Sequence, residues 1–332
     1  MSNNTKIEWC DHTVNFWWGC EKVSPACANC YAEGLSKRFA KGRASWGKDG
    51  TRWVRHETAR RELYKLDAAA LGDGCRRRVF INSMSDTFED RPDINEARVF
   101  LWDACRWVRN LDIILLTKRP ENIARMLPTD WGEGWSEHVW LGTTVENQEQ
   151  ADKRILELIE IPAKVRFLSC EPLLGSVDLL LPDTDEWCCA ECGSLNVEAD
   201  NISDDGKWWK CMYCGASELG ECATRRAIHR VICGGESGPK ARPMHPDWAR
   251  SLRDQCAAAG VPFFFKQWGE WQPEALWDPQ TPWNQVAIKN DGAQISIYEV
   301  PEECGAHRMI RIGKKAAGRL LDGKEHNEFP TA

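Results

Sequence analysis

The sequence predicts an α/β fold: a full or partial (βα) TIM-like barrel with parallel strands and an inserted zinc ribbon. Short apolar runs of strand length recur along the chain, helical segments lie between them, and a metal-binding pattern interrupts the alternation once. Continuous apolar runs are typical of parallel strands that are buried on both faces. The seven runs are 14–18, 79–82, 112–117, 139–143, 164–169, 229–233 and 261–266.

Helix signals occupy the segments between these runs. Asp93 and Glu96 form a pair that resembles a capping box, and Pro120 stands where the first turn of a helix tolerates proline. Elsewhere, apolar residues recur on one helical face. About seven strands that alternate with helices favour a barrel over an open doubly wound sheet. The expected helices span 97–108, 121–127, 147–159 and 246–259.

Two segments fall outside this alternation. The segment 183–222 is polar and rich in Cys and Trp, and the tail carries turn signals and one strand-like run at 294–300. We therefore expect a barrel formed by 1–182 and 223–270, with a three-cysteine loop near its N-terminus. The segment 183–222 is expected to be an inserted module, and 271–332 a C-terminal extension.

The composition is that of an ordinary globular protein. Hydrophobic residues make up 42% and charged residues 28%, which excludes disordered, collagen-like and coiled-coil chains. The net charge of −7 gives no basis for nucleic-acid binding. The chain shows neither a signal peptide nor the ~18 consecutive apolar residues of a membrane span. We expect a cytoplasmic protein without a membrane partner, and we expect Trp17, Trp18, Trp102 and Trp107 to pack in the core.

Clustered cysteines in a reducing compartment indicate metal binding or catalysis more often than disulfides. The insertion carries Cys189 and Cys192 in one CxxC pair, and Cys211 and Cys214 in a second. Two such pairs are typical of a tetrahedral structural zinc site. The alternative is a loop of cysteines without metal. Neighbouring tryptophans at 208 and 209 either cover the zinc or stack on a nucleic acid.

A second cluster, Cys20, Cys27 and Cys30, follows the first predicted strand. Three thiolates in one loop hold three corners of a 4Fe–4S cluster and leave the fourth iron open to a chelating ligand, and cysteine is the usual ligand of such clusters. Two alternatives remain open. The loop either forms a zinc or structural site completed by another Cys or His, for which His12 is a candidate, or binds no metal.

This loop resembles that of the radical S-adenosylmethionine superfamily. The chain more closely resembles an uncharacterised phage and bacterial family of three-Cys-motif proteins, over most of 7–270. The spacing here is C-x₆-C-x₂-C, whereas that superfamily usually has C-x₃-C-x₂-C with an aromatic residue before the last cysteine; here Asn29 precedes Cys30 and Tyr31 follows it. Besides the loop, the similar segments are IEW (7–9), NSMSD (82–86), LTKRP (116–120), SCEP (169–172), GGESG (234–238) and FKQWG (265–269).

The resemblance implies two cofactors, a 4Fe–4S cluster and S-adenosylmethionine. In that superfamily the open iron binds the amino and carboxylate groups of S-adenosylmethionine, and reductive cleavage makes a 5′-deoxyadenosyl radical. Asp86 or Glu236 is then expected to hold the cofactor's amino group.

Polar residues gather where the predicted strands end, and barrel enzymes carry their chemistry at these carboxyl ends. Helix capping explains Thr143 as well as function does. It explains Lys118 and Lys266 poorly, because cations are disfavoured at helix N-termini. We expect Lys118, Glu171 and Lys266 to be catalytic and some of these residues to bind an anion. The residues expected to contact the cofactor are Tyr31, Ser83, Asp86, Thr143, Ser169, Gly234, Gly235 and Glu236.

Two functions remain. The first is a radical-S-adenosylmethionine-like iron–sulfur enzyme, whose substrate the sequence does not identify and for which a nucleic acid is one option. The second is a non-enzymatic module of phage origin that is stabilised by bound metal and binds nucleic acid or a partner protein. The polar strand ends favour the enzyme, and the unusual cysteine spacing favours the binding module.

Overall fold

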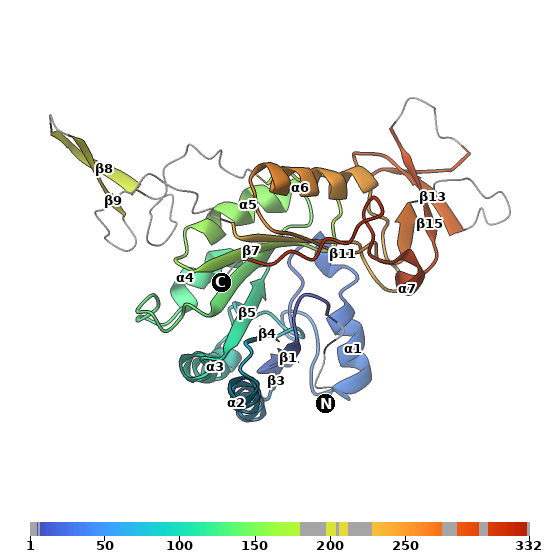
Figure 1. Ribbon diagram of the computed structural model, residues 1–332. Coiled ribbons are helices and arrows are strands. Elements are labelled where there is room, and N and C mark those ends of the chain that lie inside the picture. The colour runs from blue at the N-terminus through green and yellow to red at the C-terminus, as the bar shows by residue number, and fades with distance from the viewer. Residues whose placement is uncertain are drawn as a thin grey trace.

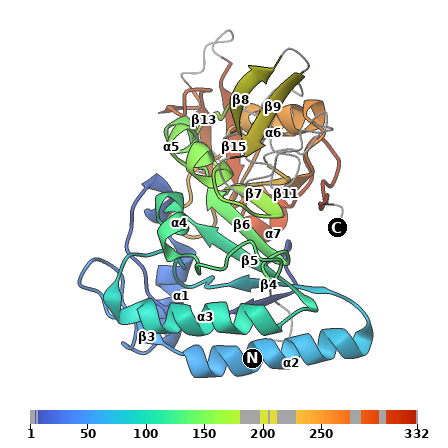
Figure 2. The same ribbon diagram turned by 90° about the vertical axis from the view of Figure 1, so that its left-hand side faces the viewer.

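The computed structural model describes residue 5 and residues 7–179, 197–203, 206–211, 228–273, 284–298 and 305–330. Its centre is a seven-stranded parallel sheet that curls as an open half-barrel (Figures 1 and 2). In spatial order, the strands are β1 (His12–Val14), β4 (Arg77–Ile81), β5 (Leu111–Thr117), β6 (Val139–Thr144), β7 (Val165–Cys170), β10 (Arg230–Gly234) and β11 (Phe263–Gln267).

The two faces of this sheet carry separate apolar clusters, because successive side chains of a strand point to opposite faces. Val79 and Ile81 of β4 belong to the cluster beneath the helices, whereas Phe80 lies on the other face with Trp9 and Phe264. The helices that cover the first face are α2 (His56–Asp73), α3 (Asn95–Trp107), α4 (Ile123–Met126), α5 (Gln148–Ile159) and α6 (Pro246–Ala258).

The cysteine loop lies between two short strands that pair with each other and not with the main sheet. These are β2 (Trp17–Trp18) and β3 (Trp53–Val54), which are antiparallel. The loop contains a 3₁₀ turn, η1 (Pro25–Cys27), and leads into α1 (Tyr31–Phe39). Two further 3₁₀ turns, η2 (Pro92–Ile94) and η3 (Pro120–Asn122), precede α3 and α4.

The C-terminal region forms a second, antiparallel sheet in the order β12-β15-β13-β14. The chain then returns to the barrel, where Asn327 makes an antiparallel bridge to Phe264 of the edge strand β11. The elements of this region are β12 (Trp271–Pro273), β13 (Gln285–Ile288), β14 (Gln294–Ile295), β15 (His307–Arg311) and α7 (Lys314–Ala317).

The described part of the insertion is one antiparallel hairpin, β8 (Val197–Ser203) and β9 (Gly206–Cys211). Cys211 ends β9, but its side chain is not described. Cys189, Cys192 and Cys214 lie outside the described residues.

The predicted α/β class with a parallel, partly closed barrel is confirmed. The structure differs from the expectations in three respects. The run 14–18 is not one strand, because β1 ends at Val14 and Trp17 begins β2. The helices α1 and α2 were not expected. Trp107 is 70% exposed and Trp18 is only half-buried, whereas Trp17 and Trp102 are buried as predicted. None of the helices in the described part of the chain combines the length and apolar character needed to cross a bilayer.

Candidate functional site

A cavity of about 580 Å³ opens at the carboxyl ends of the barrel strands, and Cys20, Cys27 and Cys30 all line it. The loop that carries them covers these strand ends. Aromatic side chains supply much of the remaining wall; they are Trp9, Trp18, Tyr31, Trp46 and Phe80. The cysteine loop and the strand ends therefore share one enclosed space, which is the place where barrel enzymes bind their substrates.

Most of the residues singled out in the sequence line this cavity. They are Tyr31, Ser83, Asp86, Lys118, Ser169, Glu171, Gly235, Glu236 and Lys266. Two others do not line it. The Thr143 hydroxyl donates a hydrogen bond to the Thr117 carbonyl oxygen at 3.1 Å. Gly234 packs closely against the side chains of Glu171 and Lys266, because a Cβ added to it would lie 3.4 Å from each.

Asp86 connects the end of β4 to the first cysteine through an arginine. Its carboxylate accepts hydrogen bonds from the Thr117 hydroxyl at 2.7 Å and from Arg119 Nη1 at 2.8 Å. The same guanidinium donates to the Glu21 carbonyl oxygen at 2.9 Å and lies 3.9 Å from Cys20 Sγ. Asp86 therefore positions Arg119, and Arg119 fixes the backbone beside Cys20.

Glu146 fixes the middle of the loop. It follows β6 and is fully buried, and its Oε1 accepts a hydrogen bond from the backbone N–H of Ala26 at 3.1 Å. Its Oε2 accepts one from Arg154 of α5 at 2.9 Å. The carboxylate thus joins the loop between Cys20 and Cys27 to the barrel.

Glu236 fixes the end of the loop. It accepts hydrogen bonds from Asn29 Nδ2 at 3.1 Å and from Arg242 Nη2 at 2.6 Å. Arg242 also donates to the Pro25 carbonyl oxygen at 3.1 Å. Because Asn29 immediately precedes Cys30, this carboxylate sets the position of the last two cysteines.

Three carboxylates at three strand ends therefore hold the loop, and each is paired with an arginine. Asp86 and Glu236 were expected to contact a cofactor, and their oxygens instead accept hydrogen bonds from the protein. No role was predicted for Glu146. Arg154 and Arg242 were missed altogether, and no local pattern marks them because their partners come from other elements.

The three sulfur atoms face the cavity without forming a compact group. The cysteines are free, and their sulfur atoms do not all lie within 4.8 Å of one another. Thiolates on one tetrahedral zinc ion are roughly 3.8 Å apart, given Zn–S bonds of about 2.3 Å. Burial, reinforced by the charge of Asp86, raises the pKa of the Cys20 thiol to about 12. A metal that binds Cys20 must therefore displace its proton.

His12, the candidate fourth ligand, lies in β1 but does not line the cavity. Its neighbour Thr13 and the following Asn15 do line it. Because side chains alternate along a strand, His12 belongs to the opposite face.

Four of the described lysines line the cavity, and two of them, Lys118 and Lys266, lie at strand ends. Lys266 Nζ donates to Glu171 Oε1 at 2.5 Å, and both side chains are largely buried. Lys118 makes no hydrogen bond or ion pair through its ammonium group within the part of the chain that the structure describes. Within the described residues, an ion pair and a cation without a counter-ion therefore line the same cavity.

The sequence model of one protein family matches almost the whole chain, at residues 4–330. That family is described as "Protein of unknown function (DUF5131)". The chain has no significant match among curated proteins or among solved structures.

Proposed function

We propose that this chain, which belongs to the DUF5131 family, is an iron–sulfur enzyme that uses S-adenosylmethionine. Cys20, Cys27 and Cys30 would each bind one iron of a 4Fe–4S cluster, and the fourth iron would bind the cofactor. The observation that carries the proposal is the position of the three cysteines, which all line one cavity at the strand ends of a partial barrel. When bound, the cluster and cofactor would supply one-electron chemistry.

The residues present fit this pair of groups. Three separated thiols suit three irons of a cluster better than one tetrahedral ion, which requires closely spaced ligands. Two buried polar atoms of cavity-lining residues, Thr144 Oγ1 and Gln267 Oε1, have no hydrogen-bond partner among the described residues. Buried polar groups are usually paired, so unpaired ones beside a cavity are consistent with a polar ligand.

The protein's own residues have separable roles in this proposal. Lys118 binds the carboxylate of the cofactor or an anionic group of the substrate, because its ammonium group has no counter-ion among the described residues. Glu171 and Lys266 form the catalytic pair, which can hold or pass a proton between Oε1 and Nζ. Ser83 and Ser169 offer hydroxyl groups to the cofactor, and Tyr31 offers its ring.

Asp86, Glu146 and Glu236 are positioning residues, since they act on the cysteines through the loop and not on a ligand.

A structural zinc in the insertion completes the proposal. Cys211 ends strand β9 of a hairpin, and a hairpin that carries CxxC turns is the arrangement of zinc ribbons. Cys189, Cys192 and Cys214 would be the other ligands. Free thiols such as Cys75 fit a reducing, cytoplasmic location. The substrate is left open in this proposal, and a nucleic acid is one option for it.

The test is a measurement of iron, sulfide and zinc in anaerobically reconstituted protein. We expect about four irons and four sulfides per chain, together with zinc bound by the insertion. Replacing Cys20, Cys27 or Cys30 with alanine should abolish the iron content while the zinc remains. Cys75→Ala is the matched control, because Cys75 is a free, exposed cysteine outside the loop, and it should bind iron normally.

Reduced, iron-loaded protein should then convert S-adenosylmethionine to 5′-deoxyadenosine. A chain that takes up no iron after reconstitution would contradict the proposal. Iron binding without any 5′-deoxyadenosine would retain the cluster and reject the use of the cofactor.

A further inference from the structure

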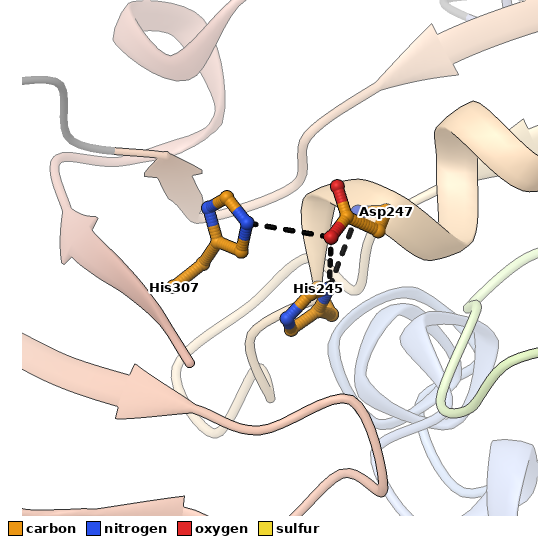
Figure 3. Close-up of side chains that lie close together, drawn as sticks. All are labelled: His245, Asp247 and His307. Atoms are coloured by element: carbon orange, nitrogen blue, oxygen red, sulfur yellow. Dashed lines mark hydrogen bonds and ion pairs between the residues drawn. The ribbon is translucent and has the colours of Figure 1, made fainter. Parts of the chain in front are cut away.

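A second group of metal-ligating side chains lies where α6 meets the C-terminal sheet. His245 immediately precedes α6, Asp247 is in its first turn, and His307 begins β15. Figure 3 shows both imidazoles directed at the same carboxylate. One ligand atom of each residue lies within 4.8 Å of the other two, and no other trio of His, Cys, Asp or Glu among the described residues does so.

One oxygen, Asp247 Oδ2, is the point on which the two rings converge. It lies 3.4 Å from His307 Nε2 and 3.9 Å from His245 Nδ1. Both distances exceed the roughly 2.9 Å of a good N–H···O hydrogen bond. The other oxygen, Oδ1, accepts a hydrogen bond from Arg250 at 2.7 Å, which orients the carboxylate and leaves Oδ2 facing the rings.

The hydrogen bonds of His245 determine which of its nitrogens carries the proton. A carbonyl oxygen can only accept, so the 3.2 Å contact to the Gly305 oxygen places the proton on Nε2. Nδ1 therefore presents a lone pair, and it accepts a long hydrogen bond from the backbone N–H of Asp247 at 3.2 Å. Metal-binding histidines characteristically donate their second ring nitrogen to a carbonyl or carboxylate in this way. His245 is also fully buried, so its ring has a fixed orientation.

We propose that His245, Asp247 and His307 bind a divalent transition-metal ion, with water completing its coordination. Two imidazoles and one carboxylate are ligands that suit zinc. In a tetrahedral zinc site with bonds of about 2.1 Å, neighbouring ligand atoms lie roughly 3.4 Å apart. The Asp247–His307 distance already has this value, and His245 Nδ1 needs to approach Oδ2 by less than an ångström.

The ion would fasten the C-terminal sheet to the barrel. His245 caps the barrel helix α6 and Asp247 lies in its first turn, whereas His307 begins β15 and Gly305 lies just before that strand. A metal bound only in the folded state adds its binding free energy to folding, so this site would stabilise the docking of the two parts. The site is independent of the function proposed for the cysteine cavity.

The test is zinc binding by the full chain, measured by equilibrium dialysis after the protein has been stripped of metal. His307→Ala and Asp247→Asn should each bind about one zinc ion fewer than the wild type. His326→Ala is the matched control, because it removes a histidine of the C-terminal region outside the group, and it should match the wild type. Zinc should raise the melting temperature of the control more than that of His307→Ala.

Cobalt distinguishes this site from the cysteine sites in the wild-type chain. Cobalt bound by nitrogen and oxygen lacks the intense sulfur-to-metal absorption of cobalt thiolates. The wild type should show a cobalt population without that absorption, and His307→Ala should lack it. Equal zinc counts in the wild type and both site variants, or the absence of this cobalt population from the wild type, would overturn the proposal.

Discussion

Glu146 Oε1 accepts a hydrogen bond from the backbone N–H of Ala26 at 3.1 Å, although 120 positions separate the two residues. The contact joins the end of β6 to the cysteine loop in a fully buried environment, and Arg154 neutralises the carboxylate. Since Asp86 and Glu236 hold the same loop from two other strand ends, the barrel determines the positions of the cysteines. The loop itself has little regular structure with which to do so.

Removal of the Glu146 carboxylate should therefore loosen the loop and destabilise the fold. In Glu146→Ala, the Ala26 N–H loses its acceptor and Arg154 is left buried without a counter-ion. We expect a loss of about 3–5 kcal/mol in the free energy of unfolding, as for other broken buried ion pairs. Urea denaturation measures this change, and the iron content of reconstituted protein should fall in parallel.

Glu149→Ala is the control for this change. Glu149 pairs with Lys153 on the same helix, at 2.5 Å, but both side chains are more than 60% exposed. An exposed pair of this kind contributes less than about 0.5 kcal/mol. If Glu149→Ala and Glu146→Ala had equal effects, the structural role of the buried contact would be refuted.

The Asp86–Arg119 pair should make stability depend on pH in the acid range. Burial by itself would raise the pKa of the Asp86 carboxyl, but the charge of Arg119 and the hydrogen bond from Thr117 outweigh it and lower the pKa. A lowered native pKa contributes stability that is complete above the unfolded value of about 3.9 and is lost as pH falls through the native pKa. The stabilisation should therefore be constant from pH 7 to about pH 5 and be lost progressively as the pH falls further, through the native pKa.

Denaturant unfolding of the wild type and of Asp86→Asn from pH 7 to pH 2 measures this dependence. Asp86→Asn should be less stable at pH 7, because Arg119 is left buried without its counter-ion, and the two curves should converge at low pH. Asp152→Asn, which changes an exposed carboxylate of α5, should follow the wild type throughout. A constant difference between wild type and Asp86→Asn at every pH would contradict the assignment.

The sequence predicted the main sheet well because its strands are buried on both faces. In β6 and β7 every residue is buried, so the apolar runs are continuous and easy to recognise. The helix α2 gave no such signal. Among its 18 residues only Ala59, Leu63 and Ala70 are buried, and charged residues separate them. The spacing of its apolar residues therefore gives only a weak signal for a helix.

The sequence predicted which residues line the candidate site, but it did not predict which of them hold the cysteine loop in place. Cysteine spacing and strand-end polarity are local patterns, and both led to residues that line the cavity. The partners of Asp86 and Glu236 are set by tertiary structure. Arg242 is six positions from Glu236, but it also donates to Pro25, 217 positions away. No spacing rule reveals such a connection.

Gly235 should be intolerant of any side chain. A Cβ atom there would lie 2.0 Å from the Trp268 carbonyl oxygen, which belongs to the backbone and cannot move aside. We expect Gly235→Ala to cost about 3 kcal/mol of unfolding free energy, at the upper end of overpacking effects.

Gly34→Ala is the opposite case, because Gly34 lies in α1 with nothing within 4 Å of the added Cβ. It should raise stability by about 0.5–1 kcal/mol. Thermal unfolding of both variants tests the pair, and a neutral Gly235→Ala would show that the two backbones can separate.

Lys118 provides a test of how the cavity binds its proposed cofactor. Its ammonium group has no counter-ion among the described residues, so a carboxylate in the cavity would be its natural partner. A charge-assisted hydrogen bond contributes about 1.5–3 kcal/mol. Lys118→Met should therefore weaken S-adenosylmethionine binding about tenfold or more, since tenfold corresponds to about 1.4 kcal/mol.

The measurement is equilibrium dialysis with cluster-loaded protein. Lys65→Met, which changes an exposed lysine of α2, should bind as the wild type does. Unchanged affinity in Lys118→Met with a normal iron content would assign the cofactor carboxylate to another group, and Lys266 would be the next to examine because it is the other lysine at these strand ends.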